Sequence, residues 1–217
     1  MESDFNSISY QEKKAFNFIK NGKYEEAEKL YRILIADGSL NSVVYTNLAA
    51  LLQIKGNRKE NIQLLKKALY LNPEMAEAHS NLGLEFAYIG DIDNAILSYN
   101  SALKINPYYV EAYNNKGQSL ELKGEKDLAI ECYKKAIEIN SNYAIAYFNL
   151  GNVLKAKKDF DLAIKKYLKA ISINSNFKEA YNNLGLLFYE TENYKDAINN
   201  LKSALNIDPN FLDALCN

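Results

Sequence analysis

The feature that most constrains this chain is a repeat with a period of 34 residues. The copies follow one another without insertion or deletion, and they begin at Ile8, Ser42, Ala76, Val110, Ala144 and Lys178. A fixed period of this length is typical of proteins in which each copy is one supersecondary unit that cannot bury its apolar face alone. The repeat therefore predicts stacked units that share one continuous core.

Within one copy, the apolar residues predict two helices. In the third copy, small and apolar residues recur at helical spacing from His79 to Phe86, and again from Ala95 to Leu103. Gly90 lies between these two stretches and suits the left-handed residue that ends a helix. Each copy is therefore expected to form a helical hairpin.

Small residues fill some fixed columns of the repeat, and a larger residue, mostly tyrosine, fills another. Position 8 is always Ala or Gly, and position 24 holds Tyr31, Leu65, Tyr99, Tyr133, Tyr167 and Leu201. We expect the small residue to let two helix backbones approach, and the larger one to fill the space beside them. Asn61 replaces the usual Ala at position 20, which predicts looser packing in the second copy. Lys158 and Glu192 replace the turn glycine, at an expected cost of about 1 kcal/mol each if that residue is left-handed.

The pattern L-G-x-x-F, then A-x-x-x-Y, then Pro closely resembles the tetratricopeptide repeat family over residues 8–211. The resemblance implies an all-α fold, an α-α superhelix that is a right-handed solenoid of antiparallel helix pairs. First helices would line its concave side and second helices its convex side. The domain prediction is a tail at 1–7, six repeats at 8–41, 42–75, 76–109, 110–143, 144–177 and 178–211, and the truncated start of a seventh at 212–217.

An asparagine recurs at position 6 of five copies, namely Asn47, Asn81, Asn115, Asn149 and Asn183. Helix propensity does not explain it, because Asn is a middling-to-poor helix former. A carboxamide carries donors and an acceptor, so a regular row of them can bind a peptide backbone. This ladder is similar to that of O-linked N-acetylglucosamine transferase repeats, which implies peptide contact. The alternative is that each amide bonds neighbouring helix backbone.

The rest of the predicted groove is a mixture of apolar and polar residues. We expect the peptide-binding residues to include, beside the asparagine column, Leu84, Tyr88, Gln118 and Asn152. Apolar patches with a few carboxylates favour a neutral or mildly basic peptide over an acidic one. The family's carboxylate clamp for chaperone tails is disfavoured, because position 2 carries no Lys or Arg.

The function predicted from these observations is a protein-protein interaction scaffold that binds an extended peptide or partner protein. The alternative is the substrate-presenting N-terminal arm of a larger multidomain enzyme such as a glycosyltransferase. The alternative rests on residues 212–217, which match the start of another copy. An uncovered C-terminal end would also allow self-association.

Other functional classes find little support in the sequence. His79 is the single histidine, and Cys132 and Cys216 lie far apart in the array, so no metal site, cofactor or catalytic residue is expected. The net charge of -1 gives no general attraction to nucleic acid. No uncharged stretch suggests membrane insertion, and the cysteine usage favours a reduced, cytoplasmic location.

Overall fold

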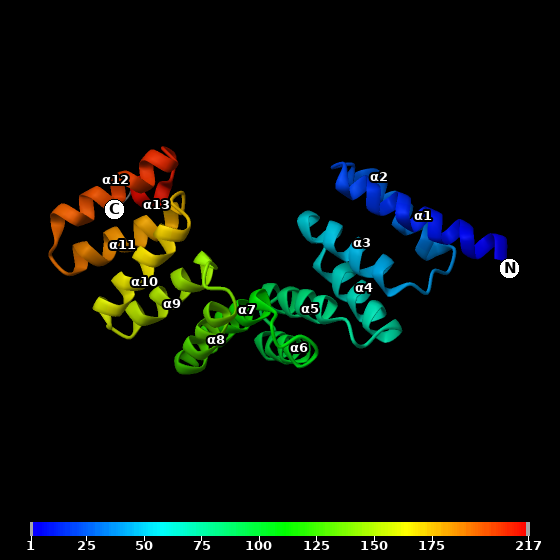
Figure 1. The fold of residues 1–217 in the computed structure, drawn as a ribbon, viewed down its shortest axis with the longest axis horizontal. Helices are drawn as coiled ribbons and strands as arrows, with labels where there is room; N and C mark the ends of the chain where they lie inside the picture. Colours follow the sequence, from blue (N-terminus) through cyan, green and yellow to red (C-terminus); the bar gives the residue numbers. More distant parts are fainter. Residues whose placement is uncertain (1, 216–217) are drawn as a thin grey trace. The chain divides into compact units, whose positions relative to one another are not determined.

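The computed structural model describes residues 2–215, which form helices and the turns between them (Figure 1). The first helices of the copies are α1 (Glu2–Lys20), α3 (Ser42–Lys55), α5 (Ala76–Tyr88), α7 (Val110–Leu122), α9 (Ala144–Ala156) and α11 (Lys178–Glu190). The second helices are α2 (Tyr24–Ala36), α4 (Arg58–Leu71), α6 (Ile92–Ile105), α8 (Lys126–Ile139), α10 (Phe160–Ile173) and α12 (Tyr194–Ile207). Consecutive helices pair in antiparallel fashion, so the predicted all-α class is confirmed.

Both ends of the described chain are helical. Helix α1 begins at Glu2 and therefore includes the stretch that the repeat pattern assigned to a tail. The sequence of α1 contains neither proline nor glycine, so nothing in it interrupts the helix before the first copy. At the other end, α13 (Leu212–Leu215) follows the sixth copy. Residues 216 and 217 of the predicted seventh copy lie outside the described residues.

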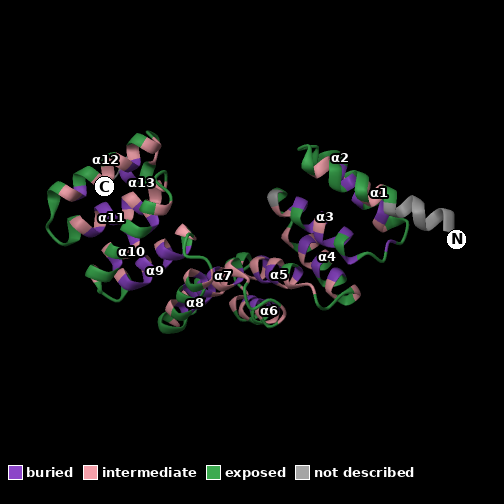
Figure 2. Cartoon of the chain, in the orientation of Figure 1, coloured by how far each residue is buried: buried purple, intermediate pink, exposed green. Residues whose placement is uncertain are grey.

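The chain divides into two compact units, Met1–Pro107 and Tyr108–Asn217. We call them the N-terminal unit, which holds α1 to α6, and the C-terminal unit, which holds α7 to α13. Within each unit, buried residues occupy the helix faces that meet neighbouring helices (Figure 2). Within each unit, the core is therefore assembled from one helical pair to the next.

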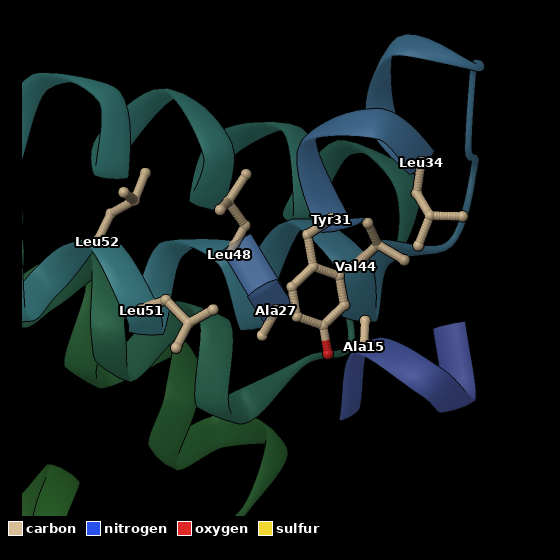
Figure 3. Packing of buried hydrophobic residues seen from close by; sticks show 8 residues of the cluster. All are labelled: Ala15, Ala27, Tyr31, Leu34, Val44, Leu48, Leu51 and Leu52. Carbon is tan, nitrogen blue, oxygen red and sulfur yellow. The ribbon is translucent and has the colours of Figure 1, made fainter. Parts of the chain in front are cut away.

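The contact between positions 8 and 24 is present as expected. A Cβ atom placed on Gly83 would lie 2.8 Å from Cε1 of Tyr99, and one on Gly151 would lie 2.7 Å from Cε1 of Tyr167. These distances leave no room for a methyl group, so glycine is what allows the tyrosine ring to lie against the helix. In the first copy, Tyr31 packs among aliphatic residues of three helices (Figure 3).

The second copy differs from the looser packing that Asn61 predicted. The Asn61 side chain is 1% exposed, and its Nδ2 donates to Oε1 of Glu85 at 3.0 Å. Arg58 donates to the same carboxylate at 3.1 Å, and its guanidinium lies 4.0 Å from the centre of the Tyr88 ring. A polar network between α4 and α5 thus occupies the place that small and aliphatic residues hold elsewhere.

Candidate binding site on the first helices

The asparagine column places one amide on each of five first helices. Four of these side chains are half-buried, while Asn149 is 6% exposed. Among the other predicted site residues, Leu84 and Asn152 are half-buried, whereas Tyr88 and Gln118 are exposed. Each of the two units carries its own part of the column.

In the N-terminal unit, the hydrogen bonding of the column depends on the residue at position 24 of the preceding copy. Nδ2 of Asn47 donates to the hydroxyl oxygen of Tyr31 at 3.0 Å. The copy before Asn81 has Leu65 instead of a tyrosine, so the corresponding hydroxyl is missing. The Asn81 side chain makes no hydrogen bond to any group that the structure describes. Asn81 is therefore a half-buried amide with all its donors and acceptors unused.

In the C-terminal unit, the amides bond to one another. Nδ2 of Asn183 donates to Oδ1 of Asn152 at 2.9 Å, and the Tyr167 hydroxyl donates to the same oxygen at 2.8 Å. Both lone pairs of the Asn152 carbonyl are thus occupied, and its NH₂ group is left to face other partners. Earlier in the same unit, Nδ2 of Asn149 donates to Oδ1 of Asn114 at 2.9 Å.

These contacts bear on the two interpretations of the column. The observed bonds run to side chains of the same and neighbouring helices, and not to helix backbone as the structural alternative supposed. A carboxamide offers two N–H donors and an acceptor with two lone pairs, so one or two bonds leave capacity unused. In the C-terminal unit the column therefore links first helices to one another, and its amides keep hydrogen-bonding capacity that these contacts do not use.

Each unit has a hollow beside its part of the column. In the N-terminal unit, a hollow of about 340 Å³ is lined by Phe16, Tyr31, Val43 and Asn47 among others. In the C-terminal unit, a hollow of about 440 Å³ is lined by Asn152, Lys155, Lys158, Tyr167, Asn183 and Glu190 among others. The first hollow is more apolar, while the second is rich in hydrogen-bond donors. Both are large enough for side chains of a ligand.

One residue on this face was missed by the sequence reasoning. Glu121, at position 12 of α7, is half-buried and accepts a hydrogen bond from the Tyr133 hydroxyl. Burial raises the pKa of the Glu121 carboxyl above its ordinary value, although the bond from Tyr133 works in the opposite direction. Position 12 is not among the predicted groove positions, yet its residue in the next copy, Lys155, lines the C-terminal hollow.

Two other kinds of site, a membrane span and a metal centre, are not found in the part of the chain that the structure describes. No helix there has the length and apolar composition that crossing a bilayer requires. Nor do any three of the described His, Cys, Asp or Glu side chains lie together as metal ligands. His79 packs with its Nε2 at 3.0 Å from the carbonyl oxygen of Pro73.

Models of the tetratricopeptide repeat match residues 43–75, 83–124, 122–158, 151–192 and 179–211. The chain belongs to the tetratricopeptide repeat family. Four of the five column asparagines lie within these matched segments. The fifth, Asn81, lies just before the segment that begins at residue 83. The predicted family is thereby confirmed, and with it the helical-hairpin interpretation of the 34-residue period.

Solved tetratricopeptide repeat structures resemble the chain over most of its length. MamA is 31% identical with a TM-score of 0.67, and the match covers 75% of this chain and 95% of MamA. YrrB, described as a tetratricopeptide repeat protein with an unusual peptide-binding site, is 22% identical with a TM-score of 0.64, over 86% of this chain and 96% of YrrB. PilF of Pseudomonas aeruginosa is 15% identical with a TM-score of 0.82, over 97% and 96%. The last two matches show the fold alone. A comparison with curated protein sequences finds no match.

Proposed function

We propose that this chain is an interaction scaffold that binds an extended peptide, or an extended segment of a partner protein, along its first helices. The observation that carries the proposal is the asparagine column, whose amides keep unused hydrogen-bonding capacity beside a hollow in each unit. An extended peptide exposes a regular series of N–H and C=O groups. Amides that offer both donors and acceptors match such a backbone without reading its side chains.

Apolar contacts on the same helices support the proposal. Val43 is 47% exposed, Tyr88 is 61% exposed and Leu122 is 71% exposed. Exposed apolar side chains beside fixed polar groups are typical of recognition surfaces, in which burial gives affinity and hydrogen bonds give orientation. The description of YrrB as having a peptide-binding site agrees with this proposal at the level of the shared fold.

Asn81→Ala tests the proposal, because the Asn81 side chain has no internal hydrogen bond to lose. Peptides of about 12 residues, which span about 40 Å when extended, would first be selected on the wild-type protein from a random displayed library. Synthetic copies of the selected peptides then serve as probes in fluorescence anisotropy. We expect Asn81→Ala to weaken their binding about fivefold, the cost of one hydrogen bond, with thermal stability unchanged.

The matched control is Asn100→Ala. Asn100 is exposed on α6, the second helix of the same repeat, so this variant makes the same chemical change away from the proposed face. Its affinity should equal that of the wild type. A failure to select any binding peptide, or equal affinities for both variants and the wild type, would contradict the proposal. Asn149→Ala is less suitable, because Asn149 is buried and bonded to Asn114.

A further inference from the structure

Glu121 lies where a bound peptide would meet it. It occupies position 12 of the first helix α7, next to Leu122, which is 71% exposed. On α9, the residue in the same column is Lys155, and Lys155 lines the hollow that also contains Asn152 and Asn183. Since the repeats are in register, Glu121 presents its carboxylate to the same face as the asparagine column.

The charge of Glu121 lacks a cationic partner in the part of the chain that the structure describes. Its hydrogen-bond partner is the Tyr133 hydroxyl, and Lys126 acts on it only through its longer-range charge. Two other half-buried or buried acids of this protein are, by contrast, paired directly with a cation. Glu28 lies 2.6 Å from Nζ of Lys55, and Glu85 lies 3.1 Å from Nη1 of Arg58.

An unpaired, partly desolvated carboxylate is unfavourable by itself. An ionised carboxylate can accept about four hydrogen bonds, and Glu121 uses one of its oxygens for Tyr133. A ligand that brings a cation to this position would satisfy the remaining lone pairs and neutralise the charge. The exposed side chain of Leu122 beside it suits the aliphatic stem of a lysine or arginine.

We infer that Glu121 and Leu122 form a subsite for a basic side chain of the bound peptide. The inference rests on the proposed function, and it specifies the class of peptide residue that binds at α7. In the next repeat the same column holds Lys155, whose Nζ lies 3.3 Å from Glu190, so that column offers no second unpaired carboxylate. The subsite therefore fixes which residue of the peptide lies on α7.

A double-mutant cycle tests the subsite with the peptides selected on the wild-type protein. In each peptide, a lysine or arginine would be replaced by norleucine, which keeps an aliphatic stem but removes the charge. We expect the wild type to prefer the basic peptide about tenfold, and Glu121→Gln to lose this preference, as for one partly desolvated charge pair. The glutamine can still accept the bond from Tyr133, so affinity for the norleucine peptide should be unchanged.

The control is Glu138→Gln on α8. The Glu138 side chain is 68% exposed on the second helix α8 and pairs with Lys135, so this variant changes the net charge equally at a position outside the proposed subsite. It should keep the tenfold preference. The subsite would be overturned if the selected peptides lack a basic residue, or if the preference for the basic peptide survives Glu121→Gln. In either case, peptide binding and the effect of Asn81→Ala would still support the proposed function. If the wild type binds no peptide, the proposed function fails and the subsite fails with it.

Discussion

After α9, the chain turns through Lys158 with a φ of 63°, in the left-handed region. The amide of Lys158 bonds to the carbonyl of Lys155, and the amide of Asp159 bonds to the carbonyl of Leu154. Gly124 makes the same turn after α7 with a φ of 86°. The geometry of the hairpin therefore imposes a left-handed residue, whichever side chain the sequence supplies there.

Replacing these non-glycine residues should stabilise the protein. We expect Lys158→Gly and Glu192→Gly each to raise the free energy of unfolding by about 1 kcal/mol, because glycine adopts the left-handed conformation without a steric penalty. Urea unfolding followed by circular dichroism measures the change. Gly124→Ala is the reverse control and should destabilise by a similar amount. Loss of stability in the glycine variants would show that the turn is not strained.

The burial of Glu121 predicts a pH dependence that can be isolated by mutation. Because burial raises the pKa of this carboxyl, the folded chain binds the proton more tightly than the unfolded chain. Its contribution to stability is therefore greatest below the ordinary pKa of 4.5 and falls as pH rises toward the folded pKa. Relative to wild type, Glu121→Gln should thus be more stable at about pH 7 than at about pH 4. A stability difference independent of pH, measured by denaturation at both values, would contradict the desolvation of Glu121.

At the scale of elements, α4 and α5 meet through a polar network that lies beside their apolar contacts. Asn61 and Arg58 of α4 both donate to Glu85 of α5, and Glu85 is 1% exposed. Oδ1 of Asn61 is buried without a hydrogen-bond partner. Such a network adds little net stability, since desolvation of its charges offsets their attraction.

Breaking the network should therefore lower the free energy of unfolding, whereas replacing it with apolar residues should change that free energy little. Glu85→Ala is expected to lower the free energy of unfolding by about 2 kcal/mol, because Arg58 and Asn61 lose their common acceptor. The double variant with Asn61→Ala and Glu85→Leu restores the residue types found at these columns in other copies, and should come within about 1 kcal/mol of wild type. Denaturant unfolding of the two variants compares them. A double variant as unstable as Glu85→Ala would refute this view.

At the scale of the whole molecule, the C-terminal unit has an apolar core of its own. Tyr147, Ala170 and Ala180 are buried together, and Phe148 packs against Phe177 with ring centroids 4.9 Å apart. The unit contains the helix pairs α7–α8, α9–α10 and α11–α12. Three stacked repeats are about the minimum for a stable array. These features suggest that the unit carries enough packing to fold alone.

We expect a fragment of residues 108–217 to be helical and to unfold cooperatively. Circular dichroism during thermal unfolding measures both properties. The fragment 144–217, which lacks one helix pair of the unit, serves as a control and should unfold at a lower temperature, because it buries less apolar surface per residue. A non-cooperative transition for 108–217 would show that its core depends on residues 1–107.

The sequence predicted the repeat geometry well, because a column repeated several times averages out local exceptions. Ser42 and Ala76 begin helices where the period placed them, and Tyr99 packs against Gly83 as the columns required. The hydrogen-bond partners of individual side chains could not be predicted from the sequence. The bond of Asn149 to Asn114 and that of Tyr133 to Glu121 depend on how side chains meet across helices, which spacing along the chain does not define. The peptide-binding role of the column stays a prediction.

The tyrosine at position 24 has a practical consequence, because the chain has 17 tyrosines and no tryptophan. The rings of Tyr31, Tyr99, Tyr133 and Tyr167 are at most 1% exposed, and burial raises the pKa of each hydroxyl. In an alkaline spectrophotometric titration, exposed tyrosines should ionise first, and these four only when the surrounding helices separate. Four of the repeats thus carry a built-in chromophore that reports their opening in ultraviolet absorbance, without any added label.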